Sequence, residues 1–175
     1  MNRSGTIHFM SSAAIFTISD KRSQGAAEDI SGPAASEIVE SMGYVVAHRG
    51  IIPDEVAAIQ EGIRTQINHV SLIVTTGGTG IAERDVTPEA LVPLFDRELP
   101  GFGEIMRTGS YPKTPLSIIS RGGAGVAGHT LIVMLPGSPG AVRDSLTLLA
   151  PAIRHIVKFL ENLPVDCEHD SRQGA

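Results

Sequence analysis

Two kinds of hydrophobic pattern alternate along this 175-residue chain. Short apolar runs, most of them nearly continuous, predict strands at 13–19, 44–52, 70–75 and 130–135, with a weaker one at 116–120. Segments whose apolar residues recur every three or four positions indicate helices at 31–42, 54–67, from 87 onward, 101–110 and 138–160. Strands that alternate with helices in this way predict right-handed βαβ units and a mostly parallel sheet.

We therefore expect an α/β fold, a three-layer α/β/α sandwich with helices on both faces of the sheet. We expect residues 1–12 to form an extension or a short edge strand, and residues 13–161 to form the α/β domain. Residues 162–175 are polar and are expected to form a loose tail. A domain of this length buries roughly two thirds of its unfolded surface, so it needs neither a metal nor disulfides for stability.

Residues of the types that cap helices precede the predicted helices: Ser31, Asp54, Thr87 and Ser138. Capping is therefore an ordinary structural role for Asp54 and Ser138. Pro151 lies inside the long last helix and predicts a kink or a break there.

Charge and cysteine content narrow the class of protein. The formal net charge of −5 argues against a non-specific nucleic-acid binder or a protein of anionic membranes, because either needs a basic surface. No apolar run approaches the roughly 18 residues of a membrane span, so no membrane partner is expected. The single cysteine, Cys167, has no intrachain partner and predicts a reducing compartment, the cytoplasm.

Three polar loops, 19–23, 75–85 and 136–139, follow predicted strands. Ligands of parallel sheets bind at these carboxyl ends. The glycine loop 75–80 can take positive φ and present backbone N–H groups to an anion, and three threonines add hydroxyl donors: Thr75, Thr76 and Thr79. It lacks the endings of a P-loop and of a dinucleotide-binding loop, so a plain strand-exit turn is the alternative to a phosphate cradle.

Asp85 follows the glycine loop. A carboxylate beside a bound phosphate is repelled unless a divalent cation lies between them, which favours Mg²⁺ brought in with a nucleotide. The structural alternative is an interaction of Asp85 with the dipole of the helix that begins at Thr87.

Other candidate contacts also have ordinary alternatives. The segment 136–139 can bind a second anion or carbonyl, or only cap a helix. Glu104 and Arg107 can contact a ring amide and a phosphate, or pair with each other on a helix face. Arg121, after Ser120, can grip a phosphate or lie in solvent. The six histidines lack the spacing of zinc ligands, so a zinc site is not expected.

A series of separate motifs occurs in order along the chain. They are Ile18-Ser19-Asp20, Ser31-Gly32-Pro33, Ile52-Pro53-Asp54-Glu55, Thr76-Gly77-Gly78-Thr79-Gly80, Arg84-Asp85-Val86-Thr87-Pro88-Glu89-Ala90, Pro100-Gly101-Phe102-Gly103-Glu104, Ser120-Arg121 and Leu135-Pro136-Gly137-Ser138-Pro139. Together they resemble the molybdopterin adenylyltransferase family of molybdenum cofactor biosynthesis, over nearly the whole domain. Several motifs in one order are far more specific than any one of them.

The resemblance implies an enzyme that transfers AMP from Mg-ATP to the terminal phosphate of molybdopterin and releases pyrophosphate. Asp54 and Asp85 resemble the acids tied to Mg²⁺ and catalysis, and the loop that receives the pterin phosphate and the nucleotide corresponds to Thr76, Gly77, Gly78, Thr79 and Gly80. Neither acid need be a general base, because the attacking phosphate is already anionic. The same resemblance assigns other residues to the two halves of an elongated pocket: Ser19, Asp20, Glu104, Ser120, Arg121, Pro136, Gly137, Ser138 and Pro139.

The resemblance also implies a homotrimer or larger homo-oligomer, with a molybdenum-insertion enzyme as a possible partner. The chain departs from the family pattern at 112–117, where Leu116 and Ser117 stand in a stretch that the family often fills with small residues. Two other functions stay open. One is a non-catalytic protein that binds or carries molybdopterin, with the acids as structural caps; the other is an assembly protein that uses the surface of the fold.

Overall fold

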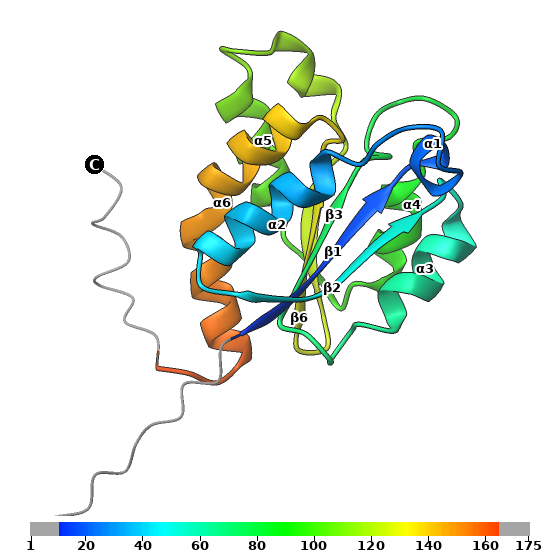
Figure 1. Ribbon diagram of the computed structural model, residues 1–175. Coiled ribbons are helices and arrows are strands. Elements are labelled where there is room, and N and C mark those ends of the chain that lie inside the picture. The colour runs from blue at the N-terminus through cyan, green and yellow to red at the C-terminus, as the bar shows by residue number, and fades with distance from the viewer. Residues whose placement is uncertain (1–10, 165–175) are drawn as a thin grey trace, which may run out of the picture.

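The computed structural model describes residues 11–164 and confirms the α/β class (Figure 1). The strands of its sheet are β1 (Ser12–Ile18), β2 (Val45–Ile52), β3 (Leu72–Thr76), β4 (Arg97–Glu98), β5 (Gly123–Ala127) and β6 (Thr130–Leu135). The helices are α1 (Asp20–Ser23), α2 (Ser31–Ser41), α3 (Val56–Arg64), α4 (Thr87–Leu91), α5 (Pro100–Ser110) and α6 (Pro139–Leu160), with short 3-10 helices η1 (Val92–Leu94) and η2 (Pro115–Ile119). Most of the expected extension and of the polar tail, with Cys167, lies outside the described residues.

The strand order β2-β1-β3-β6-β5-β4 makes the sheet mostly parallel, as expected. β2, β1, β3 and β6 are parallel, whereas β5 pairs antiparallel with β6, and β4 antiparallel with β5. The chain passes from β1 outward to β2 and then returns to place β3 on the other side of β1. A crevice forms where connections leave a parallel sheet in opposite directions, so the carboxyl ends of β1 and β3 are the expected place for a ligand.

Helices cover both faces of the sheet, with α2, α5 and α6 on one face and α3 and α4 on the other (Figure 1). Each face has its own apolar core. Val74 of β3 packs in the core that contains Leu146 of α6, while the adjacent Ile73 packs on the opposite face with Ile59 of α3. Successive residues of a strand point to opposite faces, so a strand buried on both sides must be apolar throughout. This is the physical origin of the continuous apolar runs in the sequence.

The prediction of a weak strand at 116–120 is wrong. This segment belongs to the 3-10 helix η2, and the sheet is extended instead by β5, which lies in a glycine-rich stretch of the sequence. A Cβ at Gly125 of β5 would overlap the ring of Phe95. The glycine therefore makes room for Phe95, and the same glycine content conceals the strand in the sequence.

The prediction that Ser138 caps the N-terminus of α6 is confirmed, whereas the prediction that Ser31 caps α2 is wrong. The Ser138 hydroxyl accepts from a backbone N–H in the first turn of α6 (3.2 Å). Ser31 is the first residue of α2, and the Asp29 carboxylate accepts from the N–H of Gly32 at that end (3.0 Å). Helix α6 runs through Pro151 as one helix, so the break considered there does not occur.

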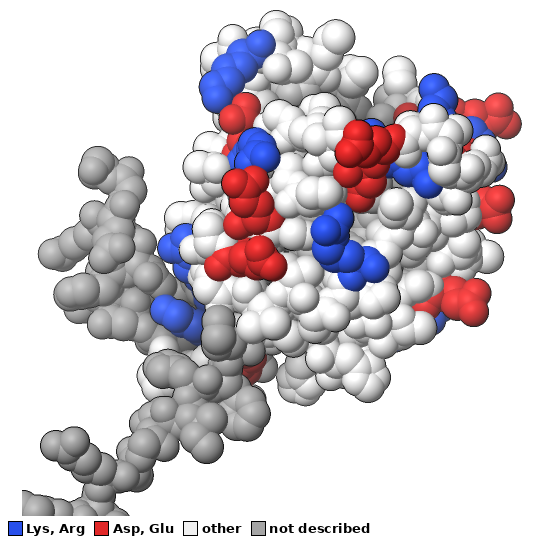
Figure 2. Space-filling model, viewed as in Figure 1, with Lys and Arg blue, Asp and Glu red and all other residues white. Residues whose placement is uncertain are grey.

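The charged side chains do not form a basic stripe on the face that Figure 2 shows, where acidic and basic groups of the described residues are interspersed. No helix within residues 11–164 is long and apolar enough to cross a membrane.

Candidate active site

The glycine loop lies between the ends of β1 and β6. Gly77 has φ +102°, and a Cβ there would overlap the carbonyl of Ile18 at the end of β1. The N–H of Gly77 donates to the carbonyl of Leu135, the last residue of β6 (3.1 Å). Gly78 follows with φ +62°. Positive φ and the direct approach of two strand ends leave no room for a side chain at Gly77, so the loop requires glycine there.

The hydroxyls of Thr76 and Thr87 hold this loop in place. Thr87 donates to the carbonyl of Gly77 (2.8 Å) and is the first residue of α4, so the cap expected from it is wrong. Thr76 donates to the carbonyl of Pro136 (2.8 Å). Thr75 is fully buried, and its hydroxyl has no partner among the described residues. The loop is thus held by the fold before any ligand binds.

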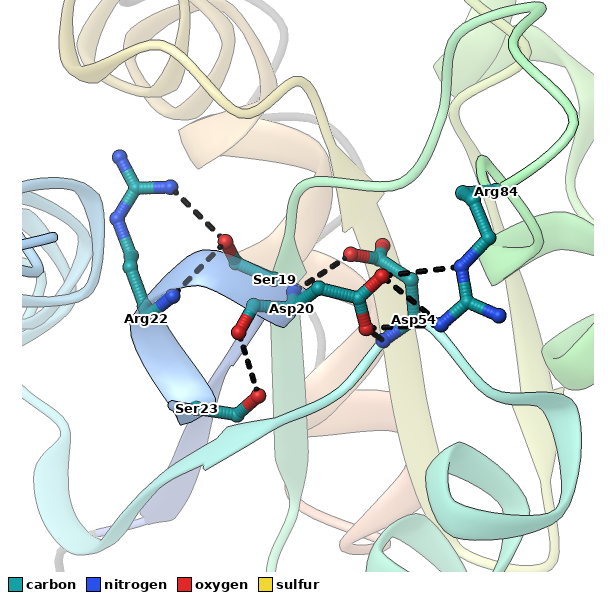
Figure 3. Close-up of polar contacts among 6 residues, drawn as sticks. All are labelled: Ser19, Asp20, Arg22, Ser23, Asp54 and Arg84. Carbon is teal, nitrogen blue, oxygen red and sulfur yellow. Dashed lines mark hydrogen bonds and ion pairs between the residues drawn. The ribbon is translucent and has the colours of Figure 1, made fainter. Parts of the chain in front are cut away.

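Two acids that follow neighbouring strands bind each other's backbone (Figure 3). The N–H of Asp20, after β1, donates to the Asp54 carboxylate (2.8 Å), and the N–H of Asp54, after β2, donates to the Asp20 carboxylate (3.0 Å). The cap expected from Asp54 is wrong, because the N-cap of α3 is Glu55 and no side chain caps it. Asp54 instead borders the glycine loop, since a Cβ at Gly78 would lie 3.1 Å from its Oδ1.

Arg84 reaches these acids from the loop that follows the glycines (Figure 3). Its Nε and Nη2 donate to the two carboxylate oxygens of Asp20, both at 2.9 Å. This guanidinium lowers the pKa of the Asp20 carboxyl, and the effect exceeds the opposing effect of burial. Both oxygens of Asp20 are therefore occupied by the protein itself.

The carboxylates at this end of the sheet are crowded. Burial raises the pKa of the Asp54 carboxyl, and the charges of Asp20 and Asp85 raise it further, while the N–H of Asp20 and the charge of Arg84 oppose the rise. Asp85 is tied to its own loop, because its Oδ2 accepts from the N–H of Ala82 (2.9 Å). Such a group of like charges is stabilised when a cation binds it.

The donor set fits a Mg²⁺ ion. Oδ1 of Asp54 and Oδ1 of Asp85 have no hydrogen-bond partner among the described residues. Within residues 11–164, no group of three or more His, Cys, Asp or Glu side chains is arranged to hold a metal. Mg²⁺ is usually held by one or two carboxylates together with substrate phosphates and water, so two free carboxylate oxygens suit it when it arrives with a nucleotide.

Arg121, expected at a phosphate, binds the protein. Its Nε donates to the carbonyl of Gly80 (2.7 Å), and its two Nη atoms bond the carbonyl of Asp85 and the carboxylate of Glu89. One guanidinium thereby joins both ends of the segment 80–85 to α4. The structure gives Arg121 the role of fixing Asp85, which no pattern in the sequence indicated.

A cavity of about 510 Å³ opens beside the glycine loop, between α5, η2 and the start of α6. Several residues expected in the site line it: Thr79, Gly80, Ser120, Pro136, Gly137 and Ser138. The hydroxyls of Thr79 and Ser120 are 3.4 Å apart in its wall. Gly80 borders the acids as well, since a Cβ there would lie 2.6 Å from Oδ2 of Asp85. The cavity and the acids are therefore adjacent parts of one site.

Residues outside every motif complete the cavity. Met106, Leu116 and Ile119 make part of its wall apolar, and Lys113 forms an ion pair with Asp144 of α6 in its lining (3.1 Å). Nothing in the sequence distinguished Lys113 or Asp144 from other surface charges.

Other expected site residues lie outside this cavity. Glu104 borders a separate cavity of about 210 Å³ beside β5. It forms no ion pair with Arg107, which donates to two backbone carbonyls. Ser19 caps α1 through its hydroxyl, and Pro139 is the first residue of α6.

Residues 14–155 match the model of a family described as a probable molybdopterin binding domain. This span contains the glycine loop, the acids and the whole lining of the larger cavity. The chain belongs to this family. The resemblance drawn from the motifs is thereby confirmed at the level of the family.

The matches to known proteins extend over most of the chain. The chain is 38% identical over 159 residues to a molybdopterin adenylyltransferase of Helicobacter pylori, strain J99, covering 89% of this chain and 88% of the relative. It is 40% identical over 149 residues to molybdenum cofactor biosynthesis protein B of Bacillus subtilis, covering 82% and 86%. The solved structure of the molybdopterin biosynthesis enzyme MoaB from Thermus thermophilus has a TM-score of 0.83 and 40% identity, covering 90% of this chain and 100% of that one. Each of these names refers to molybdopterin or to the molybdenum cofactor, and only the first states a reaction.

Arg121→Lys should loosen the segment 80–85. Lysine keeps the charge but cannot reach two carbonyls and a carboxylate at once, since it lacks the planar fork of arginine. We expect amide hydrogen exchange in 80–86 to accelerate about 10-fold or more while the rest of the domain stays protected. The matched control is Arg143→Lys, at an exposed pair with Glu37. Unchanged exchange in 80–86 would show that Arg121 does not fix this segment.

Asp54→Asn should stabilise the protein at pH 7. The raised pKa means that the fold disfavours the ionised carboxylate, so stability falls as pH rises through the ordinary carboxyl range and toward the folded pKa. Asparagine removes the charge and can still accept from the N–H of Asp20. We expect a higher thermal midpoint than wild type at pH 7, with the difference closing toward pH 3. A variant less stable than wild type at pH 7 would contradict this.

Proposed function

We propose that this protein transfers AMP from Mg-ATP to the terminal phosphate of molybdopterin. The observation that supports this most strongly is the position of Gly80, which borders both the 510 Å³ cavity and the Asp85 carboxylate. The cavity has the size and the mixed lining of a small-molecule site, and the neighbouring acids have the donor set of a Mg-nucleotide site. A pterin in the cavity would present its phosphate toward a nucleotide held at the acids.

In the proposed reaction, an oxygen of the molybdopterin phosphate attacks the α-phosphorus of ATP. The new P–O bond joins the pterin phosphate to AMP, the bond from the α-phosphorus to the oxygen that bridges to the β-phosphate breaks, and pyrophosphate leaves with that electron pair. The nucleophile is already anionic, so no base has to remove a proton. The protein therefore has to align the two phosphates and neutralise their charge.

The residues of the site divide these tasks. The backbone N–H groups of Gly78, Thr79 and Gly80 would bind phosphate oxygens, because the fold holds the loop in place in advance, while the N–H of Gly77 is bonded to the carbonyl of Leu135. Asp54 and Asp85 would hold Mg²⁺, which neutralises phosphate charge when bound. Thr79 and Ser120 place hydroxyls in the cavity wall beside this loop, where they would bind the pterin phosphate.

A second candidate is a protein that binds or carries molybdopterin without chemistry. The similarity to a relative named only as molybdenum cofactor biosynthesis protein B favours it. Calorimetry separates the two functions, because a carrier binds molybdopterin but not Mg-ATP, whereas the transferase binds both.

The family resemblance further supports two proposals, a homotrimer or larger homo-oligomer and a molybdenum-insertion enzyme as partner. The single cysteine supports a third, a cytoplasmic location. Sedimentation tests the first of these. A monomer at every concentration would count against any oligomeric form.

Asp85→Asn should abolish most of the transfer while the protein stays folded. Asparagine can still accept from the N–H of Ala82 but offers no negative charge to a cation. Groups that stabilise charge in a transition state are typically worth about 100-fold to 1,000-fold in rate, and we expect a loss in that range. The measurement is formation of adenylylated molybdopterin from molybdopterin and Mg-ATP.

The matched control is Asp96→Asn. In wild type the Asp96 carboxylate accepts from the N–H of Gly128, which lies just before β6 and therefore at the opposite end of that strand from the site. We expect this variant to keep the wild-type rate. Wild-type protein that makes no adenylylated product would overturn the proposed function, and full activity of Asp85→Asn would remove Asp85 from it.

A further inference from the structure

We propose that Arg84 binds the β- and γ-phosphates of ATP, and that the Asp20 carboxylate occupies its guanidinium only until the nucleotide arrives. This inference rests on the proposed function, since it names a contact to the nucleotide of that reaction. It differs from the expectation drawn from sequence, in which Arg121 grips a phosphate.

The acids of the site create the need for such a cation. Asp20, Asp54 and Asp85 follow β1, β2 and the glycine loop, and the polyphosphate of ATP adds further negative charge beside them. Arg84 is the basic side chain whose charge acts on the pKa of both Asp20 and Asp54. One divalent cation does not neutralise the acids and the polyphosphate together, so a basic side chain beside it lowers the remaining repulsion.

Arg84 and Arg22 lie on opposite sides of Asp20 (Figure 3). Arg22 bonds the Ser19 hydroxyl (3.3 Å) and the carbonyl of Glu28 (3.1 Å), which keeps it with α1 and the segment after it. Arg84 lies on the side of Asp54, where Mg-ATP would bind. The geometry therefore selects Arg84 over Arg22.

The contact of Arg84 with Asp20 can be exchanged. Its two donors make a fork that fits a phosphate as well as a carboxylate. The side chain of Arg84 is 59% exposed and that of Asp20 30% exposed, and exposed ion pairs contribute little to stability. Opening the pair thus costs little compared with a phosphate contact beside a metal.

Arg121 cannot make the same exchange. Two of its partners are backbone carbonyls at the ends of the segment 80–85, and a phosphate could replace them only by releasing the segment that carries Asp85. Arg84 lies within this segment, in an irregular turn, and bonds a side chain alone. The fold thus holds Asp85 firmly and leaves the adjacent arginine able to move.

The test is calorimetric binding of Mg-ATP and of AMP to wild type, Arg84→Ala and Arg84→Lys. AMP lacks the phosphates that Arg84 would contact. We expect Arg84→Ala to bind Mg-ATP about 10-fold to 100-fold more weakly and AMP within about 2-fold of wild type, because hydrogen bonds to charged groups have this size. Arg84→Lys, which keeps the charge without the fork, should lie between. Arg143→Ala, which removes another exposed, paired arginine, should bind both as wild type does.

The outcomes separate this inference from the function it rests on. If wild type binds Mg-ATP and Arg84→Ala binds it equally well, the inference is wrong and the proposed function stands. Equal weakening of Mg-ATP and AMP would also overturn it, because a purely structural arginine affects both. Wild type that binds no Mg-ATP would overturn the proposed function itself.

Discussion

Asp20 and Asp54 each accept a hydrogen bond from the other's backbone N–H, and this reciprocal pair joins the carboxyl ends of β1 and β2. The joint brings two carboxylates to the crevice beside β3, and the loop after the glycines adds Asp85. Negative charges at this spacing raise the cost of ionising any one of them, so the end of the sheet favours cations. Arg84 meets part of this demand within the protein. In the proposed function, Mg²⁺ at the open oxygens of Asp54 and Asp85 meets the rest.

The glycine loop connects this acidic crevice to the larger cavity. Gly77 is in contact with the ends of β1 and β6, so the position of the loop follows from the sheet and not from a ligand. Gly80 lines the cavity and also borders the Asp85 carboxylate, so it lies between the two. Arg121 maintains this arrangement by bonding both Gly80 and Asp85. Two adjacent regions with one shared wall fit the proposed transfer between two phosphates.

The sequence predicted well what depends on local pattern or on a series of motifs. Strands buried on both faces are continuous apolar runs, so β1, β3 and β6 were evident. The motifs pointed to Asp54 and Asp85, and the structure brings both carboxylates beside the glycine loop. Strand β5 was missed because its glycines, which accommodate Phe95, remove the apolar pattern. The hydrogen-bond partners of some side chains were missed because they are distant in the sequence. The carbonyls that Thr87 and Arg121 bind lie 10 to 41 positions away in the chain, and no local rule specifies them.

The central claim is that the two regions hold two phosphates in line, so that AMP passes from one to the other. Its most direct test follows the label from ATP labelled at the α- or the γ-phosphorus, with molybdopterin and wild-type protein. The account predicts that the α label enters the pterin product while the γ label leaves in pyrophosphate. Label from the γ position in the product, or no label from either, would contradict it.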